Sequence, residues 1–144
     1  MIAVDTNILV YAHRKDSAFH TPAMNVVRSL AEGVEQWAIP WPCVHEFLAI
    51  VTHPKVFSPP STTDEALTQV DLWFQSPTLT VVGESEKHWA TLRDLALKAR
   101  LQGPIFHDAR IAAICKDHGI RELWSADRDL SRFTTLNTRN PLLP

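Results

Sequence analysis

Short apolar runs alternate along the chain with longer stretches whose apolar positions repeat at helical spacing. The run 2–4 is of β type and ends on Asp5, and the apolar positions of residues 8–12 then have the period of a helix. Further strands are predicted at 37–39, 79–82 and 122–125, with a weak last strand at 134–136. Helices are predicted between them, at 21–32, 42–52, 62–75 and 106–118, with a helical turn near 128–133 and a Pro-rich loop at 54–61.

Residues that favour helix ends support these boundaries. Thr21 is the expected cap of the helix at 21–32, and Thr62 with Glu65 forms the pattern of a capping box. Ser85 is the expected cap of one more helix, which ends before Gly103-Pro104. Four apolar residues of that helix share one stripe at helical spacing: Trp89, Leu92, Ala96 and Ala99.

The alternation of strands and helices predicts an α/β sandwich with a mostly parallel sheet. In such folds, ligands bind at the carboxyl ends of the strands, near the point where the strand order reverses. The length of 144 residues suffices for one domain and leaves no room for a second. We therefore expect residues 1–144 to form a single domain.

Composition is that of an ordinary globular protein, with 45% hydrophobic and 21% charged residues. No apolar stretch approaches the ~20 residues needed to cross a bilayer, and no basic segment precedes the first apolar run. We therefore expect a cytoplasmic protein without membrane contact. Cys43 and Cys115 form no CxxC pair, so both are expected to pack in the core rather than to bridge or bind zinc.

The net charge of −2 conceals an uneven distribution. Residues 1–92 hold 5 Lys and Arg against 10 Asp and Glu, whereas residues 93–144 hold 9 against 6. Nine of the 14 cations are Arg, whose guanidinium suits bidentate contact with phosphate. Scattered, solvated charge explains the same numbers, so this feature alone does not identify a ligand.

Several acidic residues occupy positions where an ionised side chain is costly. Asp5 ends a strand that is expected to be buried on both faces. Asp108 shares the apolar stripe of its helix, and Glu46 lies at the edge of another apolar stripe. Asp127 and Asp129 follow the strand at 122–125. Because all these acids stand after strands or near helix starts, a parallel sheet would bring them to one edge.

Each of these acids has a simpler explanation when considered alone. Asp5, Asp108 and Asp127 could cap the helices that follow them, and the helix dipole favours Glu46 near a helix N-terminus. A cap does not explain why Asp108 shares a core-facing stripe. Converging carboxylates repel one another, and the ordinary remedy is a hard divalent cation held by oxygen ligands, here Mg²⁺ or Mn²⁺. The histidines and cysteines show no zinc-ligand spacing.

Four features together carry a resemblance to a known family: residues 4–10 (VDTNILV), Glu46, residues 107–113 (HDARIAA) and residues 125–130 (SADRDL). In their order and spacing, the chain resembles a PIN-domain ribonuclease, specifically a VapC-type toxin of a bacterial toxin–antitoxin system. The resemblance implies a PIN-like three-layer α/β/α sandwich with a mostly parallel central sheet. The chain departs from the family pattern at Ser125, where Thr is usual, and at Leu130, where an aromatic residue is common.

The resemblance also implies roles for individual residues. The acidic quartet that would hold one or two Mg²⁺ or Mn²⁺ ions consists of Asp5, Glu46, Asp108 and Asp127. The supporting residues would be Asn7, Thr6, Ser125 and Asp129, of which Asp129 is a candidate fifth acid. The candidate contacts to RNA phosphates are Arg110, Arg128, Arg132 and His107.

The function that the resemblance implies is a metal-dependent endoribonuclease that acts as a toxin. A carboxylate-bound metal ion would activate a water molecule that hydrolyses an RNA phosphodiester bond. The expected partners are an RNA substrate and a cognate antitoxin protein. Five tryptophans are many for a small core, so some are expected at an interface, which favours a homodimer.

Two other functions remain open at this point. A haloacid-dehalogenase-like phosphatase also begins with a strand that ends on Asp, but it expects a second Asp where Asn7 stands. A non-catalytic module that binds nucleic acid or a protein partner would keep the fold without the chemistry, and the intact quartet argues against it. Metal-dependent RNA cleavage would favour the nuclease, whereas hydrolysis of phosphomonoesters would favour the phosphatase.

Overall fold

A five-stranded sheet lies at the centre of the computed structural model, which describes residues 1–144. Its strands run in the order β3-β2-β1-β4-β5, and every neighbouring pair is parallel. The prediction of an α/β sandwich is confirmed, with a sheet that is parallel throughout. The strands are β1 (Ile2–Val4), β2 (Trp37–Pro40), β3 (Leu79–Val82), β4 (Glu122–Trp124) and β5 (Asn137–Arg139).

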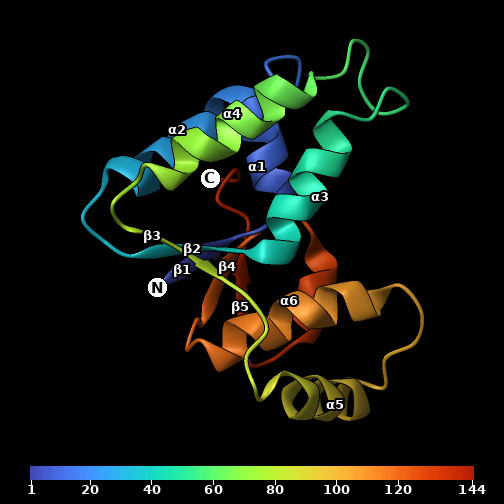
Figure 1. Ribbon diagram of the computed structural model, residues 1–144. Helices are drawn as coiled ribbons and strands as arrows, with labels where there is room; N and C mark the ends of the chain where they lie inside the picture. The colour runs from blue at the N-terminus through green and yellow to red at the C-terminus, as the bar shows by residue number, and fades with distance from the viewer.

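Helices cover both faces of the sheet. Figure 1 shows α1, α2 and α4 on one side and α5 and α6 on the other, with α3 next to α1, so the molecule has three layers. None of the helices has the length and hydropathy required to span a membrane. Their bounds are α1 (Thr6–His13), α2 (His20–Glu32), α3 (Trp41–Val51), α4 (Thr63–Phe74), α5 (His88–Ala99) and α6 (Ile105–Asp117), with a 3₁₀ turn η1 (Arg128–Arg132).

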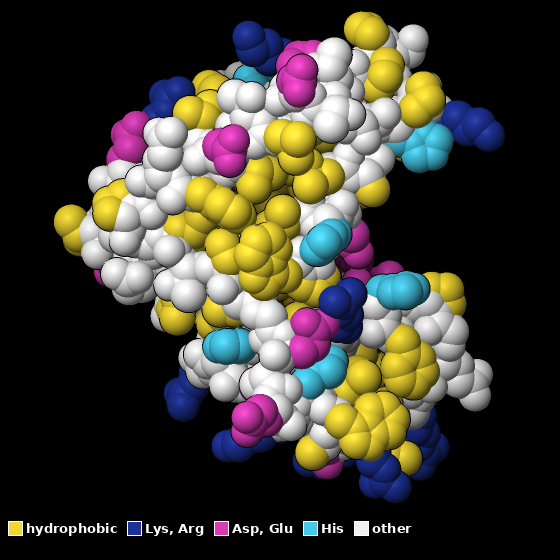
Figure 2. All heavy atoms as spheres, in the orientation of Figure 1, with side chains coloured by type: hydrophobic (Ala, Val, Ile, Leu, Met, Phe, Trp, Pro, Cys, Tyr) yellow, Lys and Arg dark blue, Asp and Glu magenta, His cyan; other side chains and the backbone are white.

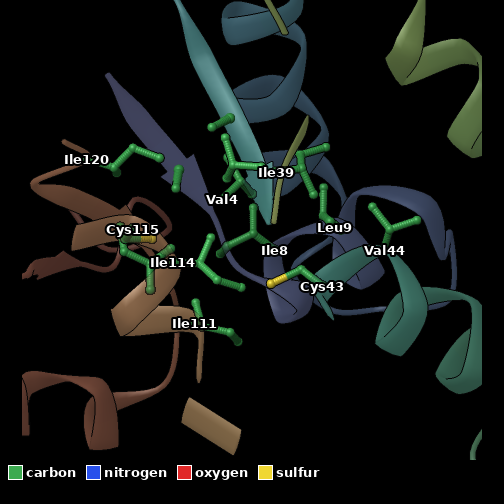
Figure 3. Close-up of a cluster of buried hydrophobic side chains, with 14 of the residues drawn as sticks. Val4, Ile8, Leu9, Ile39, Cys43, Val44, Ile111, Ile114, Cys115 and Ile120 are labelled. Carbon is green, nitrogen blue, oxygen red and sulfur yellow. The ribbon is translucent and has the colours of Figure 1, made fainter. Parts of the chain in front are cut away.

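The hydrophobic core fills the spaces between the sheet and the helices next to it. Figure 3 shows Val4 of β1 near Ile8 of α1, with Ile111 and Ile114 of α6 on the other side of the cluster. These four side chains are almost completely buried. Because helices cover both faces, the central strands β1 and β2 consist of apolar residues that are nearly all buried, instead of alternating apolar and polar ones. This packing fixes the positions of the strand ends, where the candidate site lies.

Two predicted caps are present. The hydroxyl of Thr62 accepts a hydrogen bond from the Glu65 backbone N–H at 3.1 Å, and the Glu65 carboxylate accepts one from the Thr62 N–H at 3.1 Å. This reciprocal pair is the predicted capping box at the start of α4. The Asp127 carboxylate accepts a hydrogen bond from the Asp129 N–H at 2.9 Å and so caps η1.

The predicted caps of two other helices are wrong. α2 begins at His20 with Phe19 in the cap position, so Thr21 lies inside the first turn. Ser85 does not cap α5, which begins at His88. The Ser85 hydroxyl instead accepts a hydrogen bond from the Lys87 N–H and donates one to the Asp117 carboxylate. The hydroxyl of Ser85 thus serves a contact with another helix and not the cap of its own.

The predicted last strand is wrong, and the apolar stripe of α5 is only partly buried. The Trp89 side chain is 71% exposed, because α5 lies at the surface and buries fully only Leu95. The last strand is β5 and not residues 134–136. Phe133 and Leu136 enter the core there, and the Leu136 N–H donates to the Phe133 carbonyl in a turn that precedes the strand.

Truncation of a core residue should destabilise the protein strongly. Leu123 of the central strand β4 is fully buried, so Leu123→Ala should lower the free energy of unfolding by about 2–5 kcal/mol. Leu67→Ala, at a 47% exposed position on α4, removes the same atoms and should change it by less than about 0.5 kcal/mol. Urea unfolding of both variants measures the difference, and equal losses would contradict this description of the core.

Candidate active site

The carboxyl ends of β1 and β4 meet where the strand order reverses. The chain adds β2 and β3 on one side of β1 and then β4 and β5 on the other, so β1 and β4 flank the switch point. The Asp5 N–H donates to the Trp124 carbonyl at 3.0 Å. This hydrogen bond extends the pairing of β1 with β4 by one residue beyond the end of β1. Figure 2 shows acidic side chains in a notch on the right of the molecule, between the regions of α3 and α6.

Asp5 is a buried acid and a helix cap at the same time. One carboxylate oxygen, Oδ1, accepts hydrogen bonds from the Thr6 N–H at 2.8 Å and from the Cys43 thiol at 3.6 Å. The other, Oδ2, accepts from the Ser125 hydroxyl at 2.6 Å. Burial raises the pKa of Asp5 above its ordinary value, although these three donors oppose the shift. Asp5 therefore caps α1 and also accepts hydrogen bonds from residues of two other parts of the chain.

Ser125 connects the first acid to the end of β4. Its buried hydroxyl donates to Asp5 and accepts hydrogen bonds from the Asn7 amide at 3.2 Å and the Asp127 N–H at 3.0 Å. The Asn7 side-chain oxygen in turn accepts from the Ala126 N–H at 3.1 Å. Asn7 thus steadies Asp5 indirectly, through Ser125.

Thr6 connects Glu46 to the same network. The Thr6 hydroxyl donates to the Glu46 carboxylate at 2.8 Å, while its backbone N–H donates to Asp5. Thr6 is 5% exposed, whereas Glu46 on α3 is exposed to solvent. One residue therefore holds two of the predicted acids in a fixed relation.

Asp108 has no such support. The carboxylate is partly buried in the first turn of α6 and makes no hydrogen bond or ion pair, and α6 has no side-chain cap. The interpretation of Asp108 as a cap is therefore wrong. Burial raises the pKa of Asp108 to about 6, and the charges of Asp127, Asp5, Asp129 and Glu46 add to the shift in that order.

The pKa of Asp108 shows that the predicted acids act on one another. Asp127 is partly buried and raises this pKa more than the exposed Asp129 does. Asp127 is therefore the stronger candidate for the fourth acid. The ion pairs of the molecule involve none of these five acids, so no protein cation offsets their charge.

The chemistry of these side chains fits a hard divalent cation. All five are carboxylates, which Mg²⁺ and Mn²⁺ prefer. No three Asp, Glu, His or Cys side chains lie at the spacing that would enclose an ion. Mg²⁺ is usually held by one or two carboxylates and keeps several waters, so the wider spacing is compatible with it.

The candidate phosphate contacts differ in their surroundings. Arg110 forms an ion pair with Glu84, which neutralises it. Arg128 and Arg132 form no ion pair. His107 is exposed on α6, one residue before Asp108. The structure therefore leaves Arg128, Arg132 and His107 with more freedom to meet a phosphate than Arg110.

Sequence reasoning missed the contact of Cys43 with Asp5. Cys43 was expected only to pack, and it is fully buried, but its thiol also donates to Asp5. Burial and the charge of Asp5 raise the pKa of this thiol well above its ordinary value, so it keeps its proton. No local signal in the sequence predicts this contact, because Cys43 and Asp5 are 38 positions apart.

Comparison with known proteins identifies the family. The model of the PIN domain family matches residues 2–136. The chain therefore belongs to the PIN-domain family. Among curated proteins, it is 34% identical over 142 residues to ribonuclease VapC43 of Mycobacterium tuberculosis, covering 99% of this chain and 96% of that protein. It is 30% identical over 137 residues to ribonuclease VapC48 of the same species, covering 95% and 94%.

Solved structures share the fold at lower sequence identity. VapBC2 from Rickettsia felis, bound to a DNA fragment from its promoter, matches with a TM-score of 0.70 and 20% identity, covering 96% of this chain and 98% of that one. VapC20 of M. tuberculosis, described as a sarcin-ricin loop cleaving toxin, matches with a TM-score of 0.66 and 16% identity, covering 91% and 93%. These matches confirm the three-layer PIN fold.

The stability of the metal-free protein should depend on the ionisation of Asp108. The folded protein holds this proton up to about pH 6, whereas the unfolded chain releases it near 3.8. Raising the pH from about 4 to about 6 therefore lowers the free energy of unfolding, because the folded state binds more protons. Asp108→Asn cannot ionise, so its melting temperature in EDTA should rise relative to wild type across this window. For Asp71→Asn, at an exposed position on α4, the difference in melting temperature from wild type should stay constant across the same window. An Asp108→Asn variant that melts below wild type near neutral pH would contradict the repulsion between the Asp108 carboxylate and the other acids.

Proposed function

We propose that this protein is a metal-dependent endoribonuclease, the toxin of a toxin–antitoxin pair, which hydrolyses RNA phosphodiester bonds. One observation carries the proposal: the Asp108 carboxylate is partly buried and forms no hydrogen bond or ion pair, while the charges of four other acids raise its pKa. Such an arrangement is costly unless a bound cation completes it. The ribonuclease relatives support RNA as the substrate class.

The acids have different tasks in this proposal. Asp5 and Asp108 would hold the Mg²⁺ or Mn²⁺ ion, and Glu46 and Asp127 would assist them. When bound, the ion lowers the pKa of a water molecule and polarises the scissile phosphate. Ser125 orients Asp5, and Thr6 orients Glu46.

The substrate backbone is held by residues around the acids. Arg128, which follows Asp127 and forms no ion pair, binds a flanking phosphate. Arg132 also forms no ion pair, but it lines a separate cavity with Lys98 of α5 and Lys116 of α6. His107 adds a contact beside Asp108. Arg110 contributes less, since Glu84 already occupies its guanidinium.

The two rival functions have less support. In a phosphatase of the haloacid-dehalogenase type, a second Asp would supply a proton, but the Asn7 amide cannot and is already bonded to Ser125 and Ala126. A non-catalytic module has no need for an unpaired, partly buried carboxylate such as Asp108. The following experiment also tests both rival functions.

The purified protein should cut RNA only with a divalent metal ion. With millimolar Mg²⁺ or Mn²⁺ it should release products with 5′-phosphate ends, and EDTA should abolish cleavage. Asp108→Asn should lose at least about 100-fold in kcat/KM. Asp71→Asn should match wild type. Cleavage that persists in EDTA, or 2′,3′-cyclic phosphate ends, would contradict metal-assisted attack by water.

Metal binding should also be visible without activity. Mn²⁺ should raise the melting temperature of wild type by mass action, and Asp108→Asn should gain much less. Equal gains in the two proteins would exclude Asp108 as a metal ligand while leaving RNA cleavage to be explained otherwise.

The protein is also proposed to act in the cytoplasm with an antitoxin and as a homodimer. Among the structural neighbours are VapBC complexes, which support a partner of the antitoxin type. Three tryptophans are at least partly buried, but Trp41 is 42% and Trp89 71% exposed. Trp89 shares α5 with Leu97, which is 63% exposed, so this helix is the proposed homodimer contact.

Loss of the exposed aromatic side chain on α5 should weaken self-association. Light scattering of wild type at micromolar concentration should give the mass of a dimer. Trp89→Ser should give a mass closer to that of the monomer, because the apolar contact is lost. Leu67→Ser, an exposed apolar position on α4, is the control and should remain dimeric. A wild-type protein that is monomeric throughout would contradict the dimer.

A further inference from the structure

A cavity of about 400 Å³ lies against the proposed metal site. It is formed by the turn after β4, by η1 and by the segment that follows β5. Its size falls within the range of small-ligand sites. The residues of its wall that matter here are Ser125, Asp127, Arg128, Ser131, Asn140 and Leu143.

The cavity and the acidic site share two residues. The Ser125 hydroxyl is 2.6 Å from the Asp5 carboxylate, and Ser125 also lines the cavity. Asp127 lines the cavity and is the charge that most raises the pKa of Asp108. A molecule in this cavity would therefore be adjacent to a phosphate bound at the acids.

The wall of the cavity suits a neutral polar ligand. Arg128 and Asp127 place one charge of each sign on the wall, so the cavity has no net charge of its own. The Asn140 side-chain oxygen accepts from the Leu142 N–H at 3.0 Å, which leaves the amide N–H groups free to donate. The Ser131 hydroxyl donates to the Arg128 carbonyl at 2.7 Å, which leaves its oxygen free to accept. Leu143 adds an apolar surface.

We propose that this cavity binds one nucleoside unit of the RNA, next to the scissile phosphate. A nucleoside is uncharged and has hydroxyl groups and ring heteroatoms that match the free amide and hydroxyl. Its base offers an apolar face to Leu143. The inference rests on the proposed function and deepens it, because it assigns part of the substrate recognition to residues outside the acidic set.

Binding of free nucleosides tests the cavity without catalysis. Adenosine, guanosine, cytidine and uridine are titrated into ¹⁵N-labelled protein in EDTA, and the amides of Ser131, Asn140 and Leu143 should shift. Ser131→Phe, which fills the cavity, should weaken the strongest of these interactions at least about fivefold. Ser29→Phe is the matched control, because Ser29 on α2 is also exposed and its hydroxyl donates to the carbonyl of Val26 at 2.7 Å.

Cleavage kinetics separate recognition from chemistry. Ser131→Phe should raise KM for RNA at least about tenfold. Its kcat/KM for bis(4-nitrophenyl) phosphate, which has no nucleoside, should stay within about twofold of wild type. Ser29→Phe should match wild type on both substrates.

The outcomes distinguish this inference from the proposed function. The protein could cut RNA with metal while nucleosides cause no shifts at the cavity, or while Ser131→Phe leaves KM unchanged. Either result overturns the nucleoside site and leaves the nuclease intact. Nucleoside binding at the cavity in a protein that cuts no RNA overturns the nuclease and leaves the site. Shifts confined to other surfaces also overturn the nucleoside site.

Discussion

The hydroxyl of Ser125 holds the carboxyl ends of β1 and β4 together. A serine hydroxyl has one proton to donate and two lone pairs that accept, and all three are used here. Because the Asn7 amide and the Asp127 N–H both donate to the oxygen, the proton is directed to Asp5. The Ser125 hydroxyl thus fixes one carboxylate oxygen of Asp5, while Thr6 and Cys43 donate to the other.

Asp5 and Asp108 are both at least partly buried, but they differ in the number of hydrogen bonds that their carboxylates accept. Three donors surround Asp5, whereas Asp108 has none, and burial raises the pKa of both. Asp5 therefore has a fixed position with or without a ligand, while Asp108 depends on an external cation. The fold tolerates this cost because the strands below the site are packed on both faces by fully buried residues such as Val4 and Leu123.

The sequence predicted the alternation of strands and helices, because apolar periodicity is a local signal. It could not predict contacts that depend on tertiary neighbours. Ser85 bonds to Asp117 on another helix, and Trp89 is exposed because nothing covers its side of α5. The bond from Cys43 to Asp5 spans 38 positions, and no local pattern predicts such a contact. Residue types therefore indicated the candidate acids, but not which of them would lack a hydrogen-bond donor.

The two cysteines come from different helices, α3 and α6, of the same core, and neither forms a disulfide (Figure 3). Both are fully buried, and burial raises the pKa of Cys115 to about 12, so neither thiol is reactive in the closed protein. Alkylation under native conditions would then report opening of the structure. Cys43 is a natural sensor for loosening beneath Asp5, and Cys115 reports the same for the inner face of α6, so the chain carries two site-specific probes of local unfolding without any engineered label.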